Sequence, residues 1–197
     1  LAVISPIEFT GKERVLAEIK ILRAYYYYWA LDNWGNIPFT IDFSNQDLPE
    51  QKNRQFVYDF IVQEILDNID LVQDLPTPEY YGRVTKGMAY TFLAKMYMNA
   101  EEWVGQNKFA EAVAACDEVI ALGAYEIEDD YFANFIVHNE NSRENIFVIP
   151  FHPQLTDEHF YWSHLTLNSA SRATFNMVGI PWDGFVLQPD FFTKYAE

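Results

Sequence analysis

Hydrophobic residues recur with a helical period along the first two thirds of the chain. Four stretches carry apolar side chains three or four positions apart, the spacing that places them on one face of an amphipathic helix. This pattern predicts helices over about 11–32, 53–75, 85–104 and 109–122. The positions expected to be buried are Val15, Ile19, Leu22, Tyr26 and Trp29 in the first stretch, Tyr58, Ile61, Ile65, Ile69 and Val72 in the second, Ala89, Leu93, Met96 and Ala100 in the third, and Phe109, Val113, Cys116 and Ile120 in the fourth.

The breaks between these stretches indicate how the helices are connected. Gly35 and Pro38 end the first helix, and two prolines follow the second. The turn 105–108 is so short that the third and fourth helices are expected to form an antiparallel hairpin. Small residues at the helix crossing and Tyr97 near the end of the third helix resemble a tetratricopeptide (TPR) repeat. The predicted fold class is mainly α, with TPR-like helical hairpins.

The last third of the chain has a different pattern. Residues 145–151 form a short apolar run closed by prolines, which predicts a strand, and no sustained period follows. We therefore expect an irregular, loop-rich region with short strands. The predicted organisation is a helical scaffold over 1–125 and an aromatic-rich, ligand-facing region over 126–197, both within one structural domain.

The aromatic stretch 24–39 reads AYYYYWALDNWGNIPF. Four successive tyrosines on a helix point in directions about 100° apart, so they cannot form one flat platform for a ligand. Tyr26 and Trp29 instead continue the apolar stripe of the first helix. We interpret this stretch as scaffold.

Composition and charge exclude several classes of protein. Half of the residues are hydrophobic and 17% are aromatic, which is too apolar for a disordered chain. No run reaches the roughly 20 apolar residues that cross a bilayer. The chain has 29 acidic and 13 basic residues, a formal net charge of −16, and such a surface repels nucleic-acid phosphates and anionic lipids. We expect no nucleic-acid partner.

The sequence lacks the common motifs of catalytic and metal-binding sites. The chain has no Gly-x-Ser-x-Gly, His-Glu-x-x-His or phosphate-binding glycine motif. His159 and His164 lack an evident third metal ligand, and the acidic turn 128–130 lacks the ligand spacing of a calcium loop. The single cysteine, Cys116, excludes an intrachain disulfide. We predict no catalytic residue, no cofactor and no metal.

Several segments, taken together and in order, resemble the SusD/RagB family of nutrient-binding outer-membrane lipoproteins. The first helix carries Glu18-x-x-x-Leu22-Arg23-Ala24 followed by the aromatic run and Trp34-Gly35-Asn36-Ile37-Pro38. Further similar segments are Gly82-Arg83-Val84-Thr85-Lys86-Gly87-Met88-Ala89, Leu93-Ala94-Lys95-Met96-Tyr97-Met98, Gly123-x-Tyr125, Tyr131-x-x-x-Phe135 and Asn139-Glu140-Asn141-Ser142-x-Glu144-Asn145-Ile146-Phe147. The resemblance covers residues 14–151, and 181–191 match more weakly.

The resemblance implies a non-enzymatic protein that binds oligosaccharides at the cell surface. Such proteins deliver the sugar to a SusC-like, TonB-dependent transporter in the outer membrane, and only a lipid anchor ties them to the membrane. The family's anchored cysteine lies in an N-terminal region that is missing here, and Cys116 falls in mid-helix. Because the chain begins without Met and family members are longer, we expect it to be a piece of a larger protein.

The same resemblance directs attention to aromatic side chains in the irregular region, where flat apolar faces suit sugar rings. The predicted carbohydrate-binding residues are Trp182, Tyr161 and Trp162 as stacking faces, with Asn168 and Arg172 as hydroxyl partners. The alternative is that each ring has a structural role and packs in a small hydrophobic cluster beneath the loops.

Two other functions stay open. The first is a TPR-like module that binds peptides, with a structural aromatic tail. The second is a carbohydrate-active enzyme that uses the loop carboxylates Asp157, Glu158, Asp183 and Asp190.

Overall fold

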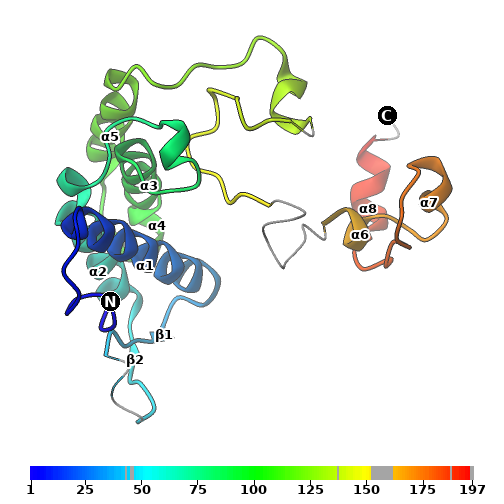
Figure 1. Cartoon of the computed structure of the whole chain (residues 1–197). Helices are drawn as coiled ribbons and strands as arrows, with labels where there is room; N and C mark the ends of the chain where they lie inside the picture. The colour runs from blue at the N-terminus through cyan, green and yellow to red at the C-terminus, as the bar shows by residue number, and fades with distance from the viewer. Residues whose placement is uncertain (43, 45–46, 137, 152–161, 187, 196–197) are drawn as a thin grey trace. The chain divides into compact units, whose positions relative to one another are not determined.

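The computed structural model describes residues 1–42, 44, 47–136, 138–151, 162–186 and 188–195. The chain divides into two compact units, Leu1–Val148 and Ile149–Glu197, here called the helical unit and the loop unit (Figure 1). The expected division of the sequence at 125/126 concerns scaffold and ligand-facing roles, and it stays a prediction.

The helical unit is built mainly from α-helices, which confirms the predicted fold class. Each of the four predicted helices is present, and the third is followed by a separate short helix. The bounds are α1 Lys12–Trp34, α2 Arg54–Leu66, α3 Lys86–Met98, α4 Ala100–Val104 and α5 Phe109–Ala121, with 3-10 turns η1 Ile69–Leu71, η2 Pro78–Tyr80 and η3 Tyr131–Phe135. In this unit α3 packs against α5, as predicted for the helical hairpin, and α1 packs against α2.

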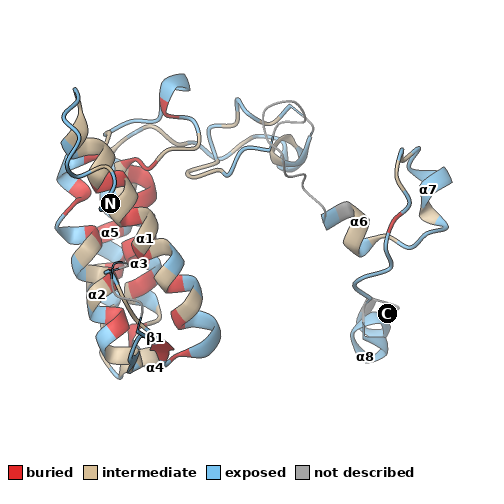
Figure 2. Cartoon of the chain, turned by 60° about the horizontal axis from the view of Figure 1, so that its bottom comes forward, coloured by how far each residue is buried: buried red, intermediate tan, exposed pale blue. Residues whose placement is uncertain are grey.

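The apolar stripes of α2 and α3 are buried as predicted. Ile61 and Ile65 are fully buried in α2, and Leu93 and Met96 are buried in α3 (Figure 2). The predicted length of the second helix, 53–75, is wrong, because α2 ends at Leu66 and η1 follows. Asn68 donates from Nδ2 to the carbonyl of Glu64 at 2.7 Å, which satisfies one of the carbonyls left free where the helix ends.

The buried face of α1 differs from the prediction. Tyr26 is 69% exposed and Trp29 is 49% exposed, so the claim that they continue a buried stripe is wrong. The helix instead buries a neighbouring face made by Ala17, Ile21, Ala24, Tyr28 and Leu31. Aromatic residues lie all around the C-terminal end of this helix, so the hydrophobic period alone could not identify the buried face. The face with two alanines lets another helix approach closely.

The same correction applies to α5. Its expected stripe is exposed: Val113 is 61% exposed, Ile120 is 75% exposed, and Cys116 is exposed as well. Ala112 and Ala115 are buried against the rest of the unit. In α5 the packed side carries small side chains, as in the TPR-like packing inferred from the sequence, whereas α1 buries two alanines together with Ile21, Tyr28 and Leu31.

The strand predicted over 145–151 is also wrong, because this segment is irregular in the structure. In the described part of the chain, the two-stranded sheet pairs β1 Ile37–Pro38 antiparallel with β2 Gln51–Lys52. Phe147 packs its ring edge-on to Tyr25, with centroids 6.0 Å apart, so its segment is fixed by side-chain packing instead of a strand ladder.

The loop unit contains short helices joined by turns, namely α6 Trp162–Thr166, α7 Ser171–Thr174, α8 Pro189–Phe192 and the 3-10 turn η4 Thr193–Tyr195. Among the described residues of this unit only Pro181 is buried (Figure 2). None of the helices in the described ranges is both long and apolar enough to cross a membrane.

Candidate functional site

The loop unit carries most of the residues predicted to bind sugar. Trp182 donates its backbone N–H to the carbonyl of His164 at 2.6 Å, and Phe185 donates to the carbonyl of Leu165 at 2.8 Å. These bonds hold the segment 182–185 along α6. The indole of Trp182 lies 5.7 Å from the imidazole of His164, and 54% of Trp182 is exposed. Trp182 therefore presents an accessible aromatic ring on a fixed backbone.

Trp162 lies at the start of α6 and is 53% exposed. Its ring stacks on Phe185 with centroids 5.6 Å apart and an interplanar angle of 27°. The structure thus brings Trp162 and Trp182 to the same small unit, each beside the other's segment. Tyr161, the third predicted stacking residue, lies outside the described residues.

The two predicted hydroxyl partners are engaged with their own loop. The Asn168 side-chain oxygen accepts from the backbone N–H of Ser171, the first residue of α7, at 3.0 Å. Arg172 donates from Nε to the carbonyl of Met177 at 3.3 Å and from Nη2 to that of Val178 at 3.2 Å. Arg172 also lines a hollow of about 370 Å³. Their contacts to a ligand stay a prediction.

The loop carboxylates behave as parts of this scaffold. Asp183 has a positive φ of 55° and accepts from the backbone N–H of Ser169 at 3.2 Å. Asp190 lies in the first turn of α8, while Asp157 and Glu158 fall outside the described residues. Across the described ranges, His, Cys, Asp and Glu form no group of three or more that could hold a metal ion.

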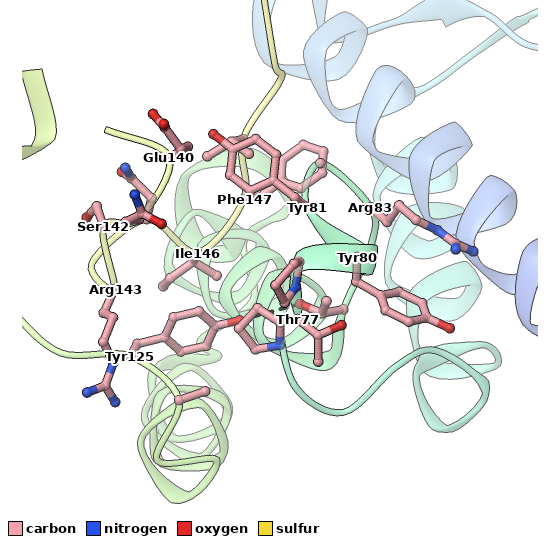
Figure 3. Close-up of a pocket in the computed structure, with 18 residues that line it drawn as sticks. Thr77, Tyr80, Tyr81, Arg83, Tyr125, Glu140, Ser142, Arg143, Ile146 and Phe147 are labelled. Atoms are coloured by element: carbon pink, nitrogen blue, oxygen red, sulfur yellow. Dashed lines mark hydrogen bonds between the residues drawn. The ribbon is translucent and has the colours of Figure 1, made fainter. Parts of the chain in front are cut away.

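The helical unit contains a cavity of about 490 Å³ that the sequence did not indicate as a site (Figure 3). We call it the Tyr125 cavity. It is lined by residues of the segment 76–85 around η2, by Ala124 and Tyr125 after α5, and by residues of the segment 140–148. Loops far apart in the sequence thus meet beside the N-terminal end of α3.

The Tyr125 ring is held against a glycine of α3. A Cβ atom at Gly87 would lie 2.0 Å from the Tyr125 hydroxyl and 2.5 Å from the ring edge, so a larger residue does not fit there. The hydroxyl lies 3.4 Å from Oγ1 of Thr85. Burial raises the pKa of Tyr125, and its hydroxyl remains a neutral donor and acceptor at physiological pH. Gly87 and Tyr125 both belong to the segments that carry the family resemblance. That membership was the one indication of this cavity that the sequence offered.

Both arginines at this cavity are paired with carboxylates. Arg83 donates from Nε and Nη2 to the two oxygens of Glu18 at 3.0 and 2.8 Å, and its guanidinium lies 4.5 Å from the ring centre of Tyr80. Arg143 pairs through Nη1 with Glu126 at 2.7 Å. Glu18 and Arg83 belong to two separate motifs of the family resemblance, and their pairing shows that these motifs tie α1 to the segment before α3.

Comparisons with known proteins agree with this structure. No protein-family model matches the chain. The chain is 34% identical over 138 residues to the starch-binding protein SusD of Bacteroides thetaiotaomicron (strain VPI-5482), a match that covers 68% of this chain and 24% of that protein. The chain therefore spans about a quarter of the length of this curated relative.

Solved structures share the fold. A SusD superfamily protein from Bacteroides fragilis NCTC 9343 superposes with a TM-score of 0.70 at 16% identity, over 86% of this chain and 36% of that one. A laminarin-binding SusD-like protein gives 0.63 at 25% identity, over 72% and 32% of the two chains. Surface glycan-binding protein A from Bacteroides thetaiotaomicron gives 0.60 at 27% identity, over 72% and 29%. With the paired motif residues and the sequence match to SusD, these likenesses show that the chain belongs to the SusD/RagB family.

Proposed function

We propose that the protein to which this chain belongs binds oligosaccharides without transforming them. The observation that carries the proposal is the 34% identity to a starch-binding protein over 138 residues. A relative of 25% identity is described as laminarin-binding, and both starch and laminarin are neutral glucans. The loop unit supplies a suitable chemistry, because exposed aromatic faces stack on the C–H groups of sugar rings.

We place the main sugar contact in the loop unit, at Trp182 and Trp162, with Tyr161 nearby in the sequence. Trp182 and Trp162 are each about half exposed, and each is fixed by a ring contact to a neighbour. Fixed, exposed rings lose little conformational freedom when a ligand stacks on them. Asn168 and Arg172 would then act as hydroxyl partners at the edge of the stacked sugar.

The proposal extends to transport. By analogy with its family, the protein would be lipid-anchored at the cell surface in the outer membrane and deliver bound oligosaccharide to a SusC-like, TonB-dependent transporter. The support is family membership. Co-purification of the intact protein with that transporter from solubilised outer membranes would test it, and repeated failure under conditions that keep the transporter folded would contradict it.

The binding claim is tested by calorimetry or affinity electrophoresis with starch and laminarin. We expect Trp182→Ala combined with Trp162→Ala and Tyr161→Ala to weaken binding by at least about tenfold, since each lost stacking contact is worth about 1 kcal/mol. Trp34→Ala is the matched control, because Trp34 is 73% exposed and lies at the end of α1. Unchanged binding in the triple variant would refute this site.

Two further assays, of reducing-sugar release and of peptide binding, separate the competing functions. Release of reducing sugar from either glucan would support a carbohydrate-active enzyme. Peptide binding without any sugar binding would instead support a TPR-like interaction module.

A further inference from the structure

We propose that the Tyr125 cavity is a second ligand site, separate from the aromatic loop unit, and that it takes one or two rings of a neutral sugar. Its volume of about 490 Å³ falls within the usual range of small-molecule sites, about 300–1,000 Å³. All residues that line it belong to the helical unit. The inference therefore does not depend on the loop unit's residues.

The first argument is the presence of aromatic faces with a fixed position. Tyr81 lines the cavity and is 43% exposed, so a ligand can reach its ring. Phe147 lines it too, and its ring is held by the edge-on contact with Tyr25. Figure 3 shows both rings among the residues that line the cavity. Such rings offer apolar surface to the C–H face of a sugar.

The second argument is the set of hydroxyl and amide groups. Tyr125, Thr77, Ser142 and Asn145 all line the cavity. Among the described residues, the Tyr125 hydroxyl makes one long contact, 3.4 Å, with Thr85, and it retains capacity for a stronger hydrogen bond. Because Gly87 seats the Tyr125 ring, this hydroxyl is placed before a ligand arrives, which reduces the entropy lost on binding.

The third argument concerns charge and selects a neutral ligand. Arg83 is neutralised by Glu18 and Arg143 by Glu126, so an anionic ligand would have to compete with these carboxylates. Glu140 also lines the cavity and would repel an anion. The cavity is lined by hydroxyls and amides beside aromatic rings, and each lining arginine is paired. This lining matches an uncharged polyhydroxylated ring better than a phosphate or a uronic acid.

The test uses calorimetry on the chain with maltose and laminaribiose, and with digalacturonic acid as the anionic probe. We expect Tyr81→Ala to weaken binding of a neutral disaccharide about tenfold, and Tyr125→Phe about fivefold through the lost hydroxyl. Tyr131→Ala is the matched control, since Tyr131 is 73% exposed in the same unit and does not line the cavity, and we expect it to change affinity by less than about twofold. Far-UV circular dichroism checks the folding of each variant. If Tyr81→Ala is misfolded, Tyr125→Phe, which keeps the ring packed against Gly87, decides the test.

The outcomes separate this site from the loop-unit site. A neutral disaccharide whose binding is weakened by Tyr81→Ala and Tyr125→Phe but survives Trp182→Ala supports the cavity. Binding that is lost in Trp182→Ala and unchanged in both cavity variants overturns the cavity and leaves the proposed function intact. Preference for digalacturonic acid, or no binding of any probe once Trp182 is replaced, also overturns it.

Discussion

The helical unit buries apolar side chains from α1, α2, α3 and α5, whereas Pro181 is the one buried residue among the described residues of the loop unit. In the helical unit, an ion pair also joins residues as distant in the sequence as Glu18 and Arg83. In the loop unit, backbone hydrogen bonds join the segment 182–185 to α6, as between Trp182 and His164. The first unit is stabilised by its core and the second by backbone hydrogen bonds between its segments.

This difference separates stability from ligand access. Hydrophobic burial is the dominant favourable term in folding, so the helical unit has the means to fix its own geometry. The loop unit keeps large rings in water, which costs stability but leaves Trp162 and Trp182 available for contact. Binding residues on loops that a rigid scaffold supports are a common arrangement.

The largest expected effect on the free energy of unfolding comes from shortening a buried isoleucine of the helical unit, with an exposed isoleucine of the loop unit as its match. Ile61 is fully buried in α2, while Ile180 of the loop unit is 57% exposed. We expect Ile61→Ala to lower the free energy of unfolding by about 2–5 kcal/mol, because it leaves a cavity. Ile180→Ala should change it by less than about 0.5 kcal/mol. The measurement is denaturant unfolding followed by helical circular dichroism, and equal effects would contradict the contrast between the units.

A smaller effect is expected from a matched pair of arginines. Arg83 donates two hydrogen bonds to the buried carboxylate of Glu18, whereas Arg172 donates to two exposed carbonyls of its own loop. Lysine cannot reproduce a two-pronged guanidinium contact. Arg83→Lys should therefore lower the free energy of unfolding by about 1–2 kcal/mol, and Arg172→Lys by less than about 0.5 kcal/mol.

The same unfolding assay checks this pair. If Arg83→Lys were neutral, the link between α1 and the segment before α3 would contribute nothing measurable. If Arg172→Lys were the more harmful, the helical signal would depend on the loop unit, against the separation argued above.

Periodicity predicted the helices of this chain because most of them carry a clear apolar stripe. It placed the buried faces of α2 and α3 correctly, since each has one strong stripe. It chose the wrong face of α1 and α5. The buried face of α5 is made by Ala112 and Ala115, and that of α1 combines Ala17 and Ala24 with larger apolar side chains. Hydrophobicity alone does not report how closely two helix axes can approach.

The candidate sites show a similar limit. The exposure of Trp182 agrees with its place between proline and glycine in the sequence. The Tyr125 cavity was not predicted, because its walls come from the separate segments 76–85, 124–125 and 140–148, which meet only in the fold. Gly87 and Tyr125 lie in segments of the family resemblance, but their contact is known only from the structure, in which the Tyr125 ring occupies the space beside Gly87.

The smallest expected effect on the free energy of unfolding at neutral pH concerns Tyr58 in α2, whose hydroxyl is buried in the core. Tyr58 is 3% exposed, and its hydroxyl has no hydrogen-bond partner among the described residues. Burial, with smaller contributions from Tyr97, Asp59 and Glu111, raises the pKa of Tyr58 to about 12. Because an unfolded tyrosine has a pKa of about 10, the unfolded state loses its proton first, and stability present below pH 10 is lost as the pH rises toward about 12.

Replacing Tyr58 by phenylalanine therefore separates the effect of burying the hydroxyl at neutral pH from the effect of its ionisation at alkaline pH. At pH 7 we expect Tyr58→Phe to change the free energy of unfolding by less than about 1 kcal/mol, because the lost hydroxyl was buried without a partner. Above pH 10 the variant should lose less stability than the parent, since it has no proton to release at this position. Tyr131→Phe is the matched control, because the ring of Tyr131 is 73% exposed and its hydroxyl meets water in both states. A parent and a Tyr58→Phe variant with parallel alkaline unfolding curves would show that Tyr58 is solvated in the folded protein, and the core of the helical unit would then be less complete than its burial indicates.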